Sequence, residues 1–267
     1  MTIQHKISLY QVDTFTNKAF SGNPAAVCLL PEARNTDWMQ AVATEMNLSE
    51  TVFVTTCDDG FTLRWFTPVV EINLCGHATL ATAHVLWEQG ILRTNLSARF
   101  HTKSGILQAK LSAGWIQLDF PAELATELLA PKALLVALNL AETPVLCTEL
   151  DYLVVLASAN AVNELSPDFS LLKSLNRRGV IVTAPASEPG LDFVSRFFAP
   201  ALGIDEDPVT GAAHCVLYPY WCERLNKASL TAFQASKRGG LIKLQGRGTR
   251  VLISGQAVTV MSGELHA

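Results

Sequence analysis

Two short segments place side chains suited to proton transfer at the start of a predicted helix. The first is NLCGHAT at 73–79 and the second is DEDPVTGAA at 205–213. A thiol or carboxyl just before a helix N-terminus feels the positive end of the helix dipole, which favours its ionised form. Cys75 in the first segment and Asp207 in the second are therefore candidate acid–base groups, with His77 beside Cys75 as a further candidate.

An internal repeat relates these two segments. RWFTP at 64–68 aligns with RFFAP at 196–200, and the matched residues lie 132 positions apart (64 to 196). The same offset pairs Cys75 with Asp207. Because the offset is about half of the 267 residues, the repeat predicts two similar halves.

The two halves predict the same order of elements: strand, helix, strand, strand, helix. We expect two domains, 1–118 and 119–267, each with a central helix, and the last residues of the chain can pack on the first domain. The predicted strands are 6–14, 25–30, 51–55, 61–67, 152–156, 180–183 and 192–198, and the predicted helices are 37–46, 76–90, 168–175 and 210–225.

Two helix starts directed at the junction of the halves would form an anion site. Free N–H groups at helix N-termini bind carboxylates without a metal or a cofactor, and a cleft between two halves is a common ligand site. The backbone at Gly76, His77, Gly211 and Ala212 is therefore expected to bind a substrate carboxylate. The alternative is that the repeat records a gene duplication and nothing about chemistry.

Each candidate side chain also has a purely structural interpretation. Asp207 precedes Pro208 and could cap the second helix. Cys75 could be a small buried hydrophobic residue, and His77 could only form a hydrogen bond at the helix start.

Composition limits the classes of partner. Hydrophobic residues make up 49% of the chain and charged residues 16%, which predicts a large core. The net charge of −4 and the lack of a Lys/Arg cluster argue against a nucleic-acid partner. The polar beginning of the sequence, the lack of an apolar run of membrane length and the lack of Cys-x-x-Cys spacing predict a cytoplasmic protein.

Five motifs taken together resemble a known family. They are VDTF at 12–15, GNPA at 22–25, NLSET at 47–51, CGHAT at 75–79 and DPVTG at 207–211. In this order, over nearly the whole chain, they resemble the phenazine-biosynthesis PhzF-like isomerase family.

The resemblance implies an α+β fold of two pseudo-symmetric diaminopimelate-epimerase-like domains. Each would be a mixed or antiparallel sheet wrapped around a central helix, with the active site at the junction. Family members are generally homodimers that use no cofactor.

The resemblance also assigns roles to residues. Glu50 would be the principal proton shuttle, with Asp207 and His77 as its partners, and Asn23 would contact the substrate. Cys75 would be retained from related racemases and epimerases, which have a cysteine before each helix. Many family members carry a serine where this chain has Ala212, which places the phenazine-precursor substrate in doubt.

Glu50 could otherwise be an ordinary surface acid near a helix end. Its counterpart in the second half lies near Gly179 and cannot ionise, and this asymmetry favours a special role for Glu50.

Other classes of function remain open. Cys75 with His77 as its base would make a hydrolase or transferase, although residues two apart at a helix start rarely bring thiol and imidazole into contact. A catalytically idle metabolite-binding or interaction protein is a third possibility. A metal site of His77, His84, His214 and Cys215 is disfavoured by their spacing, and the chain lacks nucleotide-binding glycine motifs.

Overall fold

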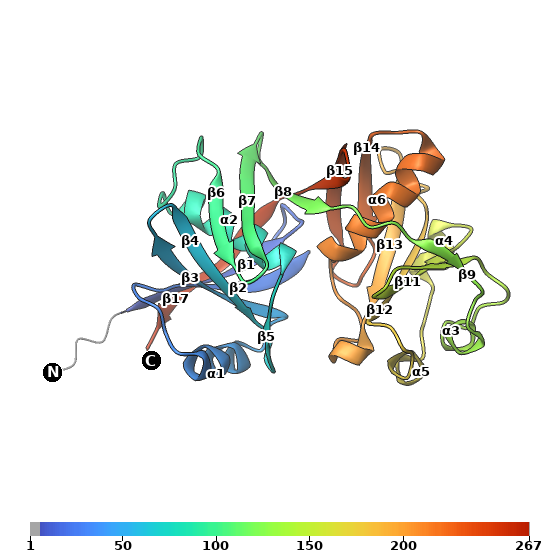
Figure 1. The fold of residues 1–267 in the computed structure, drawn as a ribbon, viewed down its shortest axis with the longest axis horizontal. Helices are drawn as coiled ribbons and strands as arrows, with labels where there is room; N and C mark the ends of the chain where they lie inside the picture. Colours follow the sequence, from blue (N-terminus) through green and yellow to red (C-terminus); the bar gives the residue numbers. More distant parts are fainter. Residues whose placement is uncertain (1–5, 267) are drawn as a thin grey trace. The chain divides into compact units, whose positions relative to one another are not determined.

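The computed structural model describes residues 6–266 of the chain (Figure 1). The chain divides into two compact units. The first contains the residues up to Asp119 and those from Ser254 on, and the second spans Phe120–Ile253. This division lies one residue from the expected boundary, and the end of the chain belongs to the first unit because its last strand pairs with the first. Residues 1–5, part of the polar beginning used above, lie outside the described residues.

The first unit is a mixed sheet in the order β17-β1-β2-β3-β4-β6-β7-β8. Neighbouring strands are antiparallel except for the pairs β2–β3 and β4–β6, which are parallel. A short strand, β5, pairs with β4. The strands are β1 (Ile7–Thr14), β2 (Asn23–Leu29), β3 (Glu50–Cys57), β4 (Gly60–Phe66), β5 (Glu71–Ile72), β6 (Ala98–Thr102), β7 (Gly105–Ser112), β8 (Trp115–Pro121) and β17 (Ala257–Leu265).

One helix, α2 (Gly76–Glu88), forms the centre of this unit. It packs against β1, β2, β3, β7 and β17 (Figure 1). Nearly all its residues from His77 to Trp87 are buried. A helix that is apolar around its whole circumference must be enclosed on all sides. Helix α1 (Thr36–Met46) instead packs on β3 and β4 through one apolar face, and Asn35 caps it by accepting from the Trp38 amide at 2.8 Å.

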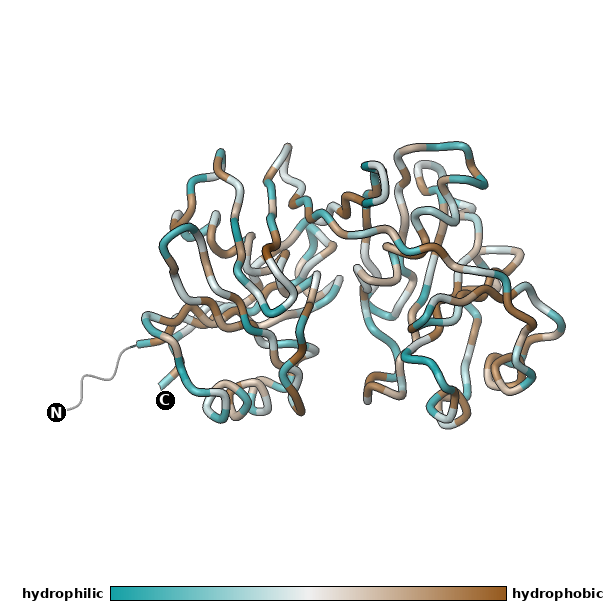
Figure 2. The backbone as a smooth tube through the Cα atoms, in the orientation of Figure 1, coloured by the Kyte–Doolittle hydropathy of each residue, from teal (hydrophilic) through white to brown (hydrophobic). Residues whose placement is uncertain are grey.

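The second unit repeats this pattern of strand directions. Its order is β9-β10-β11-β12-β13-β14-β15, with parallel pairs β11–β12 and β13–β14. The hydrophobic strands β11 and β12 are brown along much of their length in Figure 2. The elements are β9 (Thr126–Leu128), β10 (Val145–Cys147), β11 (Asp151–Val155), β12 (Gly179–Pro185), β13 (Phe193–Phe198), β14 (Ser229–Gln234), β15 (Gly240–Arg247), β16 (Arg250–Gly255), the helices α3 (Lys132–Ala137), α4 (Ala159–Asn163) and α5 (Phe169–Lys173), and the 3₁₀ helix η1 (Pro200–Leu202).

The second central helix, α6 (Gly211–Leu225), contains a proline. Pro219 has no N–H, so the carbonyl of Cys215 four residues earlier loses its helical donor. The backbone N–H of Glu123 takes that place and donates to the Cys215 carbonyl at 3.0 Å. This hydrogen bond connects the segment that precedes β9 to the middle of α6.

The structure contains all the expected elements, and their ends differ from the expected ones by at most two residues. One inference from the repeat is wrong. The two central helices have the N-cap residues Cys75 and Thr210, which are 135 positions apart (75 to 210), so Thr210 and not Asp207 is the structural counterpart of Cys75. The three-residue η1 lengthens the connection in the second unit. No helix among residues 6–266 is long and apolar enough to span a membrane.

Candidate active site

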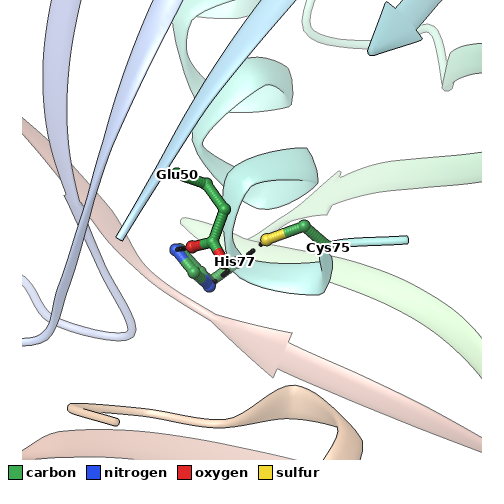
Figure 3. Close-up of side chains that lie close together, drawn as sticks. All are labelled: Glu50, Cys75 and His77. Carbon is green, nitrogen blue, oxygen red and sulfur yellow. Dashed lines mark hydrogen bonds and ion pairs between the residues drawn. The ribbon is translucent and has the colours of Figure 1, made fainter. Parts of the chain in front are cut away.

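Three side chains of the first unit converge at the start of α2 (Figure 3). Nε2 of His77 lies 2.9 Å from Oε2 of Glu50. Nδ1 of the same imidazole lies 3.5 Å from Sγ of Cys75. His77 therefore bridges a carboxylate and a thiol through its two ring nitrogens.

The backbone fixes all three positions. Glu50 is the first residue of β3, where it is in register with Ala25 of the parallel strand β2. Cys75 is extended, with φ −143°, and its carbonyl accepts from the amide and hydroxyl of Thr79 at 3.1 and 2.6 Å. These bonds stabilise the first turn of α2. The three side chains therefore come from the first residue of β3 and from the start of α2.

The cluster is buried although two of its members can carry charge. Glu50 exposes 9% of its surface, His77 7% and Cys75 6%. The fully buried Asn23, the first residue of β2, places Nδ2 3.4 Å from Nδ1 of His77. Asn23, expected to contact substrate, thus lies beside the candidate catalytic groups. Buried ionisable groups need partners to stay charged, and clusters of this kind are concentrated at functional sites.

The surroundings shift two pKa values in this cluster. Burial by itself lowers the pKa of His77, but its contacts with the acidic groups of Cys75 and Glu50 raise it well above 6.5. Burial raises the pKa of the Cys75 thiol above its usual 9.0, and the Glu50 carboxylate raises it further. The raised pKa of His77 favours its imidazolium form beside Glu50, and the raised pKa of Cys75 favours the neutral thiol.

The structure corrects one expectation about Cys75 and His77. We expected their spacing to keep thiol and imidazole apart, but the two groups are in hydrogen-bonding contact. The extended backbone of Cys75 turns its side chain back over the first turn of the helix, toward the ring of His77.

In the second unit, Asp207 belongs to a separate polar group at the start of α6. Its Oδ2 accepts from the Thr210 hydroxyl at 2.5 Å. Its carbonyl accepts from Nε2 of Gln234 at 2.8 Å, and Oε1 of Gln234 accepts from the Thr210 amide at 2.8 Å. Asp207 is therefore not the N-cap residue that the alternative interpretation suggested, because Thr210 occupies the cap position.

Gln234 is a member of this group that the sequence did not suggest. It is fully buried at the end of β14, where a neutral amide must have partners. A glutamine in an apolar strand, LTAFQ, was the only available signal.

The starts of the two central helices differ from those of the surface helices. Asn35, Ser158 and Asp168 each cap a surface helix with a side-chain oxygen. The N-cap residues Cys75 and Thr210 provide no such oxygen to the first turns of α2 and α6. These turns begin at Gly76 and Gly211 and include His77 and Ala212. Their N–H groups are of the kind that bind anions.

The second unit has no equivalent of Glu50 among its described residues. Gly179 begins β12 as Glu50 begins β3, at the same place in the parallel ladder. A Cβ on Gly179 would lie 2.4 Å from Cζ of Phe197. An aromatic ring thus fills the space next to Gly179, and the ionisable group belongs to the first unit alone.

The same three side chains could also hold a metal. The ligand atoms of Glu50, Cys75 and His77 lie within 4.8 Å of one another, and the donor types suit Zn²⁺. The other residues considered for a metal lie elsewhere. His84 contacts Glu88 and Thr259, and the buried His214 hydrogen-bonds with the Thr210 carbonyl.

Comparisons with known proteins find relatives over nearly the whole chain. The family model described as phenazine biosynthesis-like protein matches residues 12–263. An uncharacterized isomerase of Halalkalibacterium halodurans is 52% identical over 96% of this chain and 97% of its own. A crystal structure of a PhzF-family phenazine biosynthesis protein from Enterococcus faecalis has a TM-score of 0.95 and 40% identity, covering 98% of this chain and all of that one. A predicted epimerase from Pseudomonas aeruginosa, 21% identical with a TM-score of 0.74 over 97% of this chain and 99% of that one, shares the fold.

Proposed function

The chain belongs to the phenazine biosynthesis-like protein family and is an isomerase, and we propose that it moves a proton on a small carboxylate-bearing metabolite without a cofactor. The resemblance inferred from the sequence is confirmed, as is the α+β, diaminopimelate-epimerase-like fold. The nature of the substrate and the roles of individual residues are the proposal.

The contact between Glu50 and His77 carries the proposal. A carboxylate can remove a C–H proton only while it is ionised, and the imidazolium of His77, 2.9 Å away, favours that state in a buried site. Glu50 would take a proton from a carbon next to an activating group of the substrate. The electron pair left on that carbon would shift into the activating group.

The return of the proton completes the isomerisation. Delivery to another carbon would move a double bond, and delivery to the opposite face of the same carbon would epimerise it. Glu50 in its protonated form is one donor. The assignment of Asp207 as another donor remains a prediction from the family resemblance.

The substrate carboxylate would bind to backbone N–H groups at helix starts. The first turn of α2, at Gly76 and His77, lies directly beside Glu50, and Asn23 adds a buried amide there. We extend the same role to Gly211 and Ala212 at the start of α6, whose N-cap residue likewise provides no side-chain oxygen to the first turn.

An exchange experiment tests the proton-transfer class. Wild-type protein is incubated in deuterated water with a pool of small carboxylates, and deuterium entering C–H positions is followed by mass spectrometry. We expect one compound to exchange with wild type and with Glu45→Gln, an exposed control in the same unit, but not with Glu50→Gln. Exchange with all three proteins would refute the role of Glu50. Absence of exchange in every compound would favour the idle binding protein.

A second candidate function uses Cys75 as a nucleophile. The 3.5 Å contact between its thiol and the His77 ring favours this hydrolase or transferase chemistry. The raised pKa of Cys75 opposes it, because the thiol stays protonated. Alkylation of Cys75 at neutral pH faster than an unactivated thiol would support the nucleophile. The homodimer and the cytoplasmic location remain predictions.

A further inference from the structure

A second group of potential metal ligands lies at the tip of the β3–β4 hairpin. Cys57 is the last residue of β3, Asp59 lies in the hairpin turn, and His101 belongs to β6. Their ligand atoms all lie within 4.8 Å of one another. Nε2 of His101 is 2.6 Å from Oδ1 of Asp59, and all three residues are at least partly exposed. The family motifs and the proposed chemistry use none of them.

The backbone holds the hairpin against β6. Phe61 and Thr62 of β4 are in parallel register with Phe100 and His101 of β6. Phe100 is fully buried, so the alternation of a strand turns His101 toward the outside.

Gly60 allows the turn to approach β6 closely. A Cβ at this position would lie 2.4 Å from the carbonyl oxygen of Arg99. The glycine therefore lets the turn that carries Asp59 lie next to the outward side chains of β6.

We propose that Cys57, Asp59 and His101 form a binding site for a divalent transition metal such as Zn²⁺. Zinc binds thiolate, imidazole and carboxylate ligands at about 2.0–2.3 Å, so atoms already within 4.8 Å of one another need only small side-chain rotations. Three protein ligands leave a fourth position for water. A thiolate and an imidazole disfavour Mg²⁺ and Ca²⁺, which prefer oxygen ligands.

Arg99 supplies a partner for the metal-binding carboxylate. Its Nε lies 3.0 Å from Oδ2 of Asp59, the oxygen that is not next to His101. An outer contact of this kind orients a ligating carboxylate and offsets negative charge at the site.

The metal site is separate from the candidate active site. Glu50 begins β3 and Cys57 ends it, and seven steps of about 3.3 Å place them roughly 23 Å apart. Metal bound at the hairpin tip would tie the turn to β6 and stabilise the folded first unit, without supplying a group to the proton transfer.

Cobalt titration of the untagged full chain tests this site, because thiolate-bound Co²⁺ absorbs in the near ultraviolet. We expect the band with wild type. We expect Cys57→Ser to lose it and His101→Ala to weaken binding by at least about tenfold, since even outer partners of metal ligands contribute that much. The matched controls Cys75→Ala and Cys222→Ser should keep the band.

A second readout does not depend on the thiolate band. Zn²⁺ should raise the Tm of wild type and leave the Tm of Cys57→Ser unchanged, since a ligand stabilises only the state that it binds. Equal affinity of wild type and Cys57→Ser would overturn the proposal and leave only a surface ion pair between Asp59, Arg99 and His101. Loss of the band in Cys75→Ala would instead assign the metal to the buried cluster.

Discussion

Acidification should destabilise the second unit through His214. The side chain is fully buried in α6, where Nδ1 lies 2.8 Å from the Thr210 carbonyl oxygen and the ring stacks on Phe193 with centroids 6.0 Å apart. The Nδ1–H donates to that carbonyl in the neutral tautomer. Burial lowers the pKa of His214 from 6.5 to about 4, and the bond to the Thr210 carbonyl offsets only part of this effect.

The shifted pKa sets both the sign and the size of the effect. The unfolded chain binds the proton near pH 6.5 and the folded chain near pH 4, so unfolding takes up a proton between these values. The stability contribution is complete above pH 6.5 and is lost as the pH falls toward 4. At about 1.4 kcal/mol per pH unit, the free energy of unfolding should fall by about 3 kcal/mol across this range.

Urea unfolding between pH 4 and 7.5 measures this dependence, with hydrogen exchange of α6 peptides as the local readout. His214→Phe keeps an aromatic ring beside Phe193 and cannot titrate, so its stability should change by about 3 kcal/mol less than that of wild type over this range. A pH dependence of His214→Phe equal to that of wild type would refute the reasoning.

Three further predictions follow from the described contacts. Glu50→Gln should lower the pKa of His77, because burial then acts with less opposing charge; an unchanged pKa in an NMR titration would contradict the ion pair. Cys75 should react with iodoacetamide more slowly than the partly exposed Cys222, as followed by peptide mass spectrometry, because burial raises the pKa of Cys75; faster reaction would favour the nucleophile. Gly179→Ala should cost about 1–3 kcal/mol in urea unfolding, because its Cβ would lie 2.4 Å from an aromatic carbon; an undiminished stability would contradict the packing.

The sequence predicted the central helices and the repeat well, because both leave a strong pattern. The segment from His77 to Trp87 is almost entirely apolar or small, which only a buried helix explains. RWFTP and RFFAP fall at the ends of β4 and β13, in equivalent places in the two sheets. A special role for Glu50 could be predicted because its counterpart in the second half, Gly179, cannot ionise.

Other features depend on contacts that sequence spacing does not show. Because η1 adds three residues before α6, the 132-residue offset of the repeat pairs Cys75 with Asp207 instead of with its structural counterpart, Thr210. The contact between Cys75 and His77 depends on the extended backbone before α2. Gln234 at the end of β14 bonds to Thr210 and Asp207 at the start of α6. No sequence motif links these two segments.

The metal-ligand group at the hairpin tip was hidden for the same reason. Cys57 and His101 are 44 residues apart (57 to 101), and the parallel pairing of β4 with β6 brings their elements together. Ligand spacing along one helix or one loop, which sequence motifs detect, does not apply to such a site.

Steady-state kinetics of Glu50→Gln test the central claim most directly, with the carboxylate identified by deuterium exchange as substrate. The account predicts that kcat falls by about 10²–10⁴-fold, the usual contribution of a general base, while Glu45→Gln keeps the wild-type kcat. Unfolding in urea checks that both variants are folded. A Glu50→Gln protein that is folded and turns over at the wild-type rate would contradict the assignment of Glu50 as the proton-transferring base.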